Sequence, residues 1–484
     1  MTISSALSSA LSGLNVASRQ AELVSSNIAN ATTEGYARRE LQTVARSSGS
    51  GQGVEVAGTL RITDRALTGD RRIAAAGAAD ADTRAAFLAR IETALGDPGA
   101  DGSLTARIAE FDAALIAAAS RPDADTRLAA VVDTATSLAR TLNAAAATVQ
   151  DARSRADATI DQQVTRLNQT LTGLADLNRQ IQRLTVMDRD ASALIDKRQQ
   201  MIDGIADLVP LREVDRGQGQ IALYTTGGAV LLDGARPAEV GFVPAGIVAA
   251  GMTLAGGALA GLTVNGRPAG TGPGGLMAGG AIAAQFALRD DVAPAIQANL
   301  DALARDLVER FAPPGPDTTL AAGDAGLFTD AGAAFDPLSE TGLAGRITLN
   351  AAADPDRGGE VWRIRDGLGA TLPGPPGGRA LVVALQQALT AGRQPASGDV
   401  SPGLRSHAGL AAEVVSAVAQ NRLSAEAEAS YTTARADALT VQDLAGGVDT
   451  DRELQDLLVI EKSYAANAKV MATVGDLIDL LLRI

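Results

Sequence analysis

The hydrophobic positions at the two ends of the chain repeat with the spacing of a coiled coil. Apolar residues step by four and then three positions near each terminus, which places them on one face of a helix. The members are Ile3, Leu7, Ala10, Leu14, Ala17, Ala21, Val24 and Ile28 at one end, and Leu457, Ile460, Tyr464, Asn467, Met471, Val474, Ile478 and Leu481 at the other. We therefore expect two long terminal helices that pair with each other or with copies from neighbouring subunits.

The pattern changes between these two terminal seams. Helix-spaced positions dominate the first half, where Val164, Leu167, Leu171, Leu174, Asn178 and Ile181 resume the heptad step. A later segment alternates apolar and polar residues between glycine pairs, which is typical of strands and turns. The predicted domains are 1–60 (helix and joint segment), 61–208 (helical body), 209–280 (β insertion), 281–430 (helical body with Gly/Pro-rich loops) and 431–484 (C-terminal helix).

These segments predict a mainly α fold with a β insertion in an elongated multidomain chain. The terminal helices would form a coiled-coil leg, beside a helical-bundle body and a small β domain. Hydrophobic residues make up 46% of the 484 residues but aromatic residues only 2%, and small side chains suit closely spaced helices. Because the ends flank the body and the body flanks the insertion, we expect the chain ends at one pole and the insertion at the other.

The charge balance narrows the possible partners. The formal net charge of −14 makes nucleic acid an improbable partner and argues against adsorption on anionic lipid. The chain has no cysteine, which excludes disulfides, thiolate metal sites and cysteine nucleophiles. No basic region precedes the first apolar residues, so we expect no secretory signal peptide. The uncharged stretch 241–266 is rich in Gly and Ala and ends in an Asn-Gly turn signal, which favours strands and turns over membrane insertion.

The residues that usually carry chemistry are sparse. His407 is the only histidine, and its place at a predicted helix start indicates a packing or helix-end role. No P-loop sequence occurs, and the loop 354–360 lacks the ligand spacing of a calcium site. Trp362 falls in an alternating stretch that predicts a strand, where it would pack rather than bind. We therefore predict no catalytic residues, no cofactor and no metal site, and the chain is not expected to be an enzyme.

Motifs at both ends place the chain in a family. Ser12-Gly13-Leu14, Asn27-Ile28-Ala29-Asn30, Thr33-Glu34-Gly35-Tyr36 and the basic Arg38 resemble the N-terminal signature of the bacterial flagellar axial proteins, which form rod, hook and hook-associated structures. The last 38 residues resemble the matching C-terminal end, with Glu461-Lys462-Ser463-Tyr464 where the family typically reads Gln-Gln-Ala-Tyr. The resemblance implies an assembly protein whose ends pack against neighbours.

The central sequence is similar to the hook-associated members of this family. The matching residues are Leu177-Asn178 with Gln180-Ile181, and Ala193-Leu194-Ile195-Asp196 with Arg198. This similarity implies a structural protein at the hook–filament junction, because rod and hook proteins should lack the long helical block at 150–208. The alternatives are a hook or distal-rod protein in the same family, a secreted coiled-coil adhesin or effector, and, least favoured, an enzyme.

The resemblance also implies an assembly surface and a set of partners. Asn27 and Asn30 can satisfy backbone groups where the first helix ends, Glu34-Gly35 would supply a turn, and Tyr36 offers an anchor with a polar tip. The predicted interface residues are Ile3, Leu7, Leu14, Val24, Asn27, Ile28, Asn30, Gly35, Tyr36, Leu457, Ile460, Tyr464, Asn467, Met471, Ile478 and Leu481. The implied partners are further copies in a ring or helical layer, hook protein, hook-associated protein 3 and a flagellar export chaperone. The implied location is extracellular, after export by the flagellar type III system without a cleaved signal.

Overall fold

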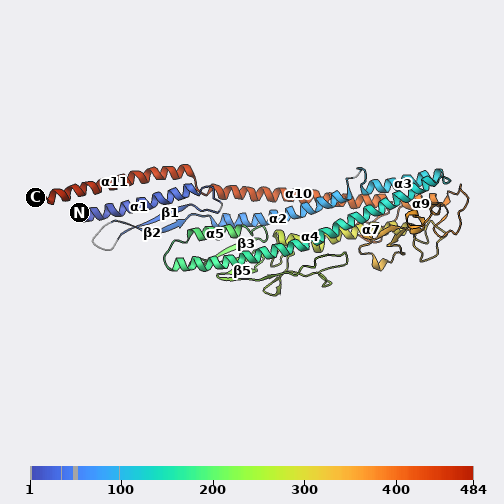
Figure 1. Cartoon of the computed structure of the whole chain (residues 1–484), viewed down its shortest axis with the longest axis horizontal. Coiled ribbons are helices and arrows are strands. Elements are labelled where there is room, and N and C mark those ends of the chain that lie inside the picture. The colour runs from blue at the N-terminus through green and yellow to red at the C-terminus, as the bar shows by residue number, and fades with distance from the viewer. Residues whose placement is uncertain (1–2, 34, 47–52, 98, 483–484) are drawn as a thin grey trace.

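The chain folds into a long rod with both termini at one end (Figure 1). The computed structural model describes all residues except 1–2, 34, 47–52, 98 and 483–484. The α-helices are α1 (Ile3–Ala29), α2 (Arg65–Leu95), α3 (Leu104–Ser120), α4 (Asp125–Val186), α5 (Ser192–Asp203), α6 (Gly280–Ala287), α7 (Ala293–Phe311), α8 (Arg363–Asp366), α9 (Ala380–Thr390), α10 (His407–Ala445) and α11 (Thr450–Leu482). The predicted fold class, mainly α with a β insertion, is confirmed.

The strands are short and form small antiparallel sheets. They are β1 (Arg39–Ala45), β2 (Val54–Arg61), β3 (Leu211–Gly217), β4 (Gln220–Thr225), β5 (Val230–Asp233), β6 (Arg236–Pro237), β7 (Val240–Gly241), β8 (Thr263–Val264), β9 (Arg267–Pro268), β10 (Phe328–Asp330) and β11 (Ile347–Leu349). The sheet orders are β1-β2, β3-β4-β5-β6, β7-β8-β9 and β10-β11. A π-helical turn at Leu288–Val292 separates α6 from α7, and short 3-10 turns lie at Pro337–Ser339, Leu343–Gly345, Ala351–Ala353 and Pro355–Arg357.

Three parts of the rod take names that are kept below. The leg comprises α1, the hairpin β1–β2 and α11, with α1 and α11 side by side at the end that holds both termini (Figure 1). The body comprises residues 65–208 and 280–445, and the insertion comprises β3 to β9. The boundary predicted between 430 and 431 falls inside α10, which continues to Ala445 before the Gly-Gly break that precedes α11.

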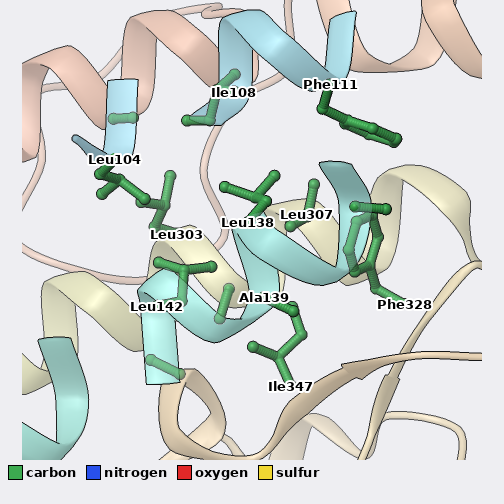
Figure 2. Packing of buried hydrophobic residues seen from close by; sticks show 14 of the residues in the cluster. Leu104, Ile108, Phe111, Leu138, Ala139, Leu142, Leu303, Leu307, Phe328 and Ile347 are labelled. Carbon is green, nitrogen blue, oxygen red and sulfur yellow. The ribbon is translucent and has the colours of Figure 1, made fainter. Parts of the chain in front are cut away.

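Helix α4 organises the body because it is long enough to serve two cores. Its 62 residues extend about 93 Å. The predicted heptad run from Val164 to Ile181 is buried at every position. The first half of α4 packs with α2, α3, α7 and α9 around the aromatic rings of Phe111, Phe311 and Phe328, and part of this core is drawn in Figure 2.

The second half of α4 supports the insertion. Its apolar stripe, including Leu167 and Leu171, packs against Leu223 and Leu231 of the sheet β3–β6. The chain direction of α4 returns this half towards the leg, so the insertion lies beside the middle of the rod (Figure 1). The prediction that the insertion forms the pole opposite the termini is therefore wrong. The sheet lies beside the second half of α4 because it is buried against the apolar stripe there. The pole opposite the termini is formed instead by α3, α9 and the loops around them.

A buried charge cluster holds the irregular part of the insertion. Arg289 of the π-helical turn donates to Asp157 at 2.7 Å, and Asp157 accepts backbone N–H groups of Ala245 and Gly246. Arg153 donates to the carbonyls of Ala249 and Met252. The predicted strands of 241–266 are therefore limited to β8 and the end of β7, while the Asn265-Gly266 turn between β8 and β9 is confirmed by positive φ angles.

Two other local predictions have clear outcomes. Trp362 precedes the short helix α8 instead of lying in a strand. The Cζ atom of the Arg363 guanidinium lies 5.0 Å from the centroid of the Trp362 ring. The alternating spacing of this stretch therefore predicted the wrong element, because four residues of helix are too short to show their own period. His407 is the first residue of α10 and is fully buried, which confirms the helix-start role.

Candidate functional site: the terminal helices and their joint with the body

The two predicted seams face each other within one chain. Ala10 and Ala17 of α1 are 3% exposed, and Val24 of α1 and Val474 of α11 are also buried. The other seam residues are only partly covered. Leu7, Leu14, Ile28, Leu457, Ile460, Asn467 and Met471 are half-buried, while Ile3, Tyr464, Ile478 and Leu481 are exposed. The pairing of α1 with α11 therefore covers the middle of the seam better than its free end.

Gly13 and Asn467 mark the closest approach of the two helices. A Cβ atom on Gly13 would lie 2.7 Å from the Nδ2 atom of Asn467, so a side chain at this position would force the asparagine to move. The Asn467 amide donates to the carbonyl of Ser463 one turn earlier in its own helix. The small residue of the Ser-Gly-Leu motif thus makes room for the one polar member of the C-terminal seam.

Asn27 is the hub of the joint, the polar cluster where the leg meets the body. Its side-chain oxygen accepts from the Tyr36 hydroxyl at 2.9 Å and from the Arg39 amide at 3.1 Å. Its Nδ2 group donates to the Arg39 carbonyl at 3.0 Å and to the Glu453 carboxylate at 2.9 Å. This buried carboxamide therefore ties the end of α1 to the start of β1 and to the first turn of α11.

Glu453 joins the two ends of the chain by charge as well as by hydrogen bonding. It is fully buried, and besides Asn27 it accepts from the Arg38 guanidinium. Arg38 also reaches Asp456, one turn further along α11, at 3.3 Å. Negative side chains in the first turn of a helix are favourably placed against the helix dipole. The basic residue that ends the N-terminal motif is therefore the counter-ion of the C-terminal helix.

A second charge cluster fastens the hairpin to the body. Arg39 and Arg61 face each other across the first rung of the hairpin. The Asp196 carboxylate of α5 accepts from Arg39 at 2.6 Å and from Arg61 at 2.7 Å. The Asp196 carboxylate therefore bridges two like charges and offsets part of their repulsion across the rung.

The turn before Tyr36 also depends on α5. Gly35 has a positive φ of 76°, and a Cβ atom there would lie 2.5 Å from the Gln200 side chain. Glycine suits this position both for its backbone conformation and for the close approach. Glu34, the other residue of the predicted turn, lies outside the described residues. Asn30 donates to the carbonyl of Ser26 at 2.8 Å, which confirms its predicted role at the helix end.

The joint is held by polar contacts, whereas the body and the insertion have apolar cores. Within the described chain, the clusters of buried hydrophobic side chains include no residue of α1, the hairpin or α11. The ion pairs at Asp196 and the Gly35 contact therefore help to hold the leg to the body, together with the two chain connections. Polar joints of this kind open locally at lower free energy than a packed core does.

The interface residues that sequence reasoning missed are the charged ones around the motifs. Arg39, Arg61, Asp196 and Glu453 complete the joint, yet the predicted interface contained none of these four residues. In the sequence these four residues share only a charged side chain. Such charges are usually solvated on a helix face, so their partners could not be identified without the fold.

The described residues show no separate chemical site. Among them, no group of acidic and histidine side chains is arranged to hold a metal ion. No helix in the described part of the chain has both the length and the apolar character to cross a membrane. The Asp306 carboxylate accepts from His407 Nδ1 at 2.9 Å and also from Arg310, so this buried trio connects α7 to the start of α10.

Comparisons with known proteins match the ends and the body separately. Residues 7–36 match the family "Flagella basal body rod protein", residues 88–312 match "Flagellar hook-associated protein FlgK helical domain", and residues 445–484 match "Flagellar basal body rod FlgEFG protein C-terminal". The first and last matches contain most of α1 and all of α11, and the central match contains α3, α4 and the insertion.

Individual relatives carry the same description. Flagellar hook-associated protein 1 of Salmonella typhimurium (strain LT2) is 26% identical over 251 residues, which are 50% of this chain and 45% of that protein. The protein of the same description from Escherichia coli (strain K12) is 24% identical over 251 residues, which are 50% of this chain and 46% of that protein. The chain thus aligns with about half the length of the curated relatives it matches. The flagellar hook junction protein FlgK from Burkholderia pseudomallei aligns with a TM-score of 0.43 and 19% identity, over 54% of this chain and 46% of that chain.

Proposed function

We propose that this chain is a member of the flagellar hook-associated protein 1 family, that it is the structural protein that joins hook to filament, and that it assembles through its paired terminal helices. The observation that carries the proposal is the incomplete cover of the leg. The α1–α11 pair leaves apolar side chains exposed along its free end, including Leu477, Ile478, Leu481 and Leu482. An exposed apolar stripe of this length is typical of an interaction surface.

The assembly surface is the seam that the sequence predicted. Ile3, Tyr464, Ile478 and Leu481 face solvent in the single chain, and copies in a ring or helical layer would cover them. The joint residues Asn27, Gly35 and Tyr36 act beside this surface, because they fix the angle at which the leg leaves the body. The division into leg, body and insertion agrees with this proposal, because the body and the insertion have cores of their own and the seam is left for contacts between copies.

The proposal includes specific neighbours and a location. Hook protein would lie on one side of the layer and hook-associated protein 3 on the other, with the layer outside the cell after export by the flagellar type III system without a cleaved signal. An export chaperone would cover Leu457, Ile460, Met471 and Ile478 before assembly, because these side chains would otherwise associate early. The role is structural and involves no catalytic reaction, cofactor or metal.

Another flagellar axial protein, of the hook or distal rod, is the second candidate within this class. The helical block at 150–208 decides between them, since rod and hook proteins should lack it. This block forms most of α4 and all of α5, and it lies inside the stretch that matches the helical domain of hook-associated proteins. The long α4 therefore favours the junction protein.

Deletion of the gene tests the proposal. Electron microscopy should show hooks without filaments, and filament protein should be shed into the medium. Complementation with an epitope-tagged chain should place immunogold label at the hook–filament boundary, and mass spectrometry of sheared flagella should find peptides from the extreme N-terminus. Cells that lack hooks altogether would indicate a rod or hook protein instead, and cells with normal filaments would refute the proposal.

A further inference from the structure

The outer face of α10 carries an apolar stripe that lies in the body and not in the terminal seams. Its residues follow steps of four, four, three, four and three positions. At about 100° per residue these steps keep all six side chains within about 80° of the helix circumference. The α10 stripe consists of Leu423, Ala427, Tyr431, Ala434, Ala438 and Val441.

Every member of the α10 stripe is exposed in the single chain. Leu423, Tyr431 and Val441 are 57%, 65% and 66% exposed, and the three alanines between them are exposed as well. The opposite face of the helix is the one that packs on α2, where Ala429 meets Ala81 and Ala85. Single exposed apolar residues are ordinary, but a continuous uncharged line of them on the side away from the core is not.

We propose that the α10 stripe is a lateral contact surface for a helix of a second copy of this chain. The heptad-like spacing indicates a helical occupant, because a 3–4 repeat presents a straight seam only to another helix. One or two alanines separate successive large side chains along the stripe, which provides both knobs and holes. The stripe also contains no charged residue, so two chains that each carry a net charge of −14 can approach along it.

The size of the stripe indicates how it is used. It extends about 27 Å, and at a helix diameter of about 10 Å it offers about 270 Å². A stable dimer buries about 800 Å² on each partner. The stripe therefore cannot hold two copies together alone, and it acts beside another contact between the same two molecules.

That other contact is the leg. Helices α10 and α11 follow one another along the same edge of the rod (Figure 1), and Leu454 and Leu458 of α11 are exposed beyond the break between the two helices. The inference rests on the proposed function in one respect, the association of copies through the leg. The α10 stripe would add a contact between the bodies of the same two copies, because the terminal seams lie in the leg and do not reach the body.

The absence of cysteine from the sequence makes site-specific photo-crosslinking possible. Ala434→Cys, labelled with benzophenone maleimide, reports on the α10 stripe. Gln162→Cys on the exposed face of α4 is the control, and Leu481→Cys reports on the leg. Each variant is labelled as the purified monomer, in which the substituted position is exposed, then assembled on the hooks of cells that lack the gene, and irradiated. The Ala434→Cys label should give a product of twice the chain mass whose peptides come only from this sequence, while the Gln162→Cys label should give none.

A variant set then tests the surface itself. Leu423→Glu, Tyr431→Glu and Val441→Glu together should abolish the Ala434→Cys crosslink and leave the melting temperature of the monomer unchanged, because all three residues are exposed. Gln162→Glu, Gln169→Glu and Thr172→Glu on α4 add the same charge and should leave the crosslink intact.

The outcomes separate this inference from the proposed function. If the Leu481→Cys label crosslinks and the Ala434→Cys label does not, the α10 stripe is rejected and the proposed function stands. A product that contains a different protein rejects a second copy as the occupant. If the chain is missing from sheared flagella altogether, the proposed function fails, and the α10 contact fails with it.

Discussion

Asn27 of α1 donates a hydrogen bond of 2.9 Å to Glu453 of α11, which joins two residues 426 positions apart in the sequence. Both side chains are buried, at 1% and 0% exposure. The same carboxamide satisfies both backbone groups of Arg39 and the hydroxyl of Tyr36. The N-terminal motif therefore binds the other end of the chain through Asn27.

Asn27→Ala should loosen the joint and leave the body folded. It removes the partner of several buried polar groups, and each group left unsatisfied costs about 1–3 kcal/mol. Hydrogen exchange should accelerate at the amides of β1 and of the first turns of α11, with unchanged protection in α4. Asn30→Ala is the matched control, since among the described residues its side chain bonds only to the Ser26 carbonyl and the Thr33 hydroxyl, both close to it in sequence. Equal effects of the two variants would contradict the role of Asn27 as hub.

Asp196→Asn should widen the range of angles between leg and body. Without the carboxylate, Arg39 and Arg61 face each other as like charges, and loss of a charged hydrogen bond costs about 1.5–3 kcal/mol. Spin labels at Ala472→Cys and Gln169→Cys would report the leg–body distance by double electron–electron resonance. The distribution of distances between the two labels should broaden. Asp207→Asn is the control, because its ion pair with Arg166 at 3.6 Å is half exposed and contributes little. An unchanged distribution in Asp196→Asn would show that the Asp196 ion pairs do not fix the leg.

The double substitution Ile478→Asp and Leu481→Asp should prevent assembly without unfolding the monomer. Both side chains are exposed in the single chain, at 36% and 59%. Between chains, each large apolar side chain would contribute about 1.5–3 kcal/mol, and a buried unpaired carboxylate would oppose contact. Cells should shed filament protein, while the purified variant melts at the wild-type temperature. Gln162→Asp with Gln169→Asp on α4 should assemble normally.

Two results would count against this seam. A large fall in the melting temperature of the double variant would show that the ends of α1 and α11 belong to the monomer core. Normal filaments on cells that carry only the double variant would show that the seam is not the assembly surface.

The stability of the chain should fall as the pH drops through about 6.5. Burial lowers the pKa of His407 below its ordinary value, although Asp306 favours the protonated form, so the folded chain takes up this proton less readily than the unfolded chain does. The unfolded chain takes up a proton below about pH 6.5, which favours unfolding by up to about 1.4 kcal/mol for each further pH unit. Urea titrations at pH 7.5, 6.5 and 5.5 would measure this decline. His407→Gln, which removes the only histidine, should flatten it in this range, and an identical decline in the variant would refute the assignment.

A second decline in stability is expected at more acidic pH. Burial alone would raise the pKa of Asp306, but the hydrogen bond from His407 and the charge of Arg310 hold the pKa below its ordinary value. The stabilisation by this carboxylate is therefore present above about pH 4 and is lost as the pH falls through the lowered pKa. Asp306→Asn should reduce the free energy of unfolding at pH 7 and weaken the loss below pH 4.

The heptad run from Val164 to Ile181 shows what the sequence alone can determine. Its spacing predicted one buried helix face, and all six positions are buried, including the polar Asn178. The sequence also predicted several boundaries and turns. These are the helix breaks at 96–103 and 121–124, the start of α10 at His407 and the turn at Asn265-Gly266. Each depends on residues within a few turns of one another, so the local period and the turn chemistry are sufficient.

The positions of these elements relative to one another were decided only by the tertiary structure. The insertion lies beside the middle of the rod because the second half of α4 offers the stripe that its sheet buries, a choice that no local pattern records. The joint depends on the register that puts Arg39 opposite Arg61 and on the packing that brings Glu453 to Asn27. A charged side chain shows in the sequence only that it needs water or a partner, and the fold alone decides which distant residue becomes that partner.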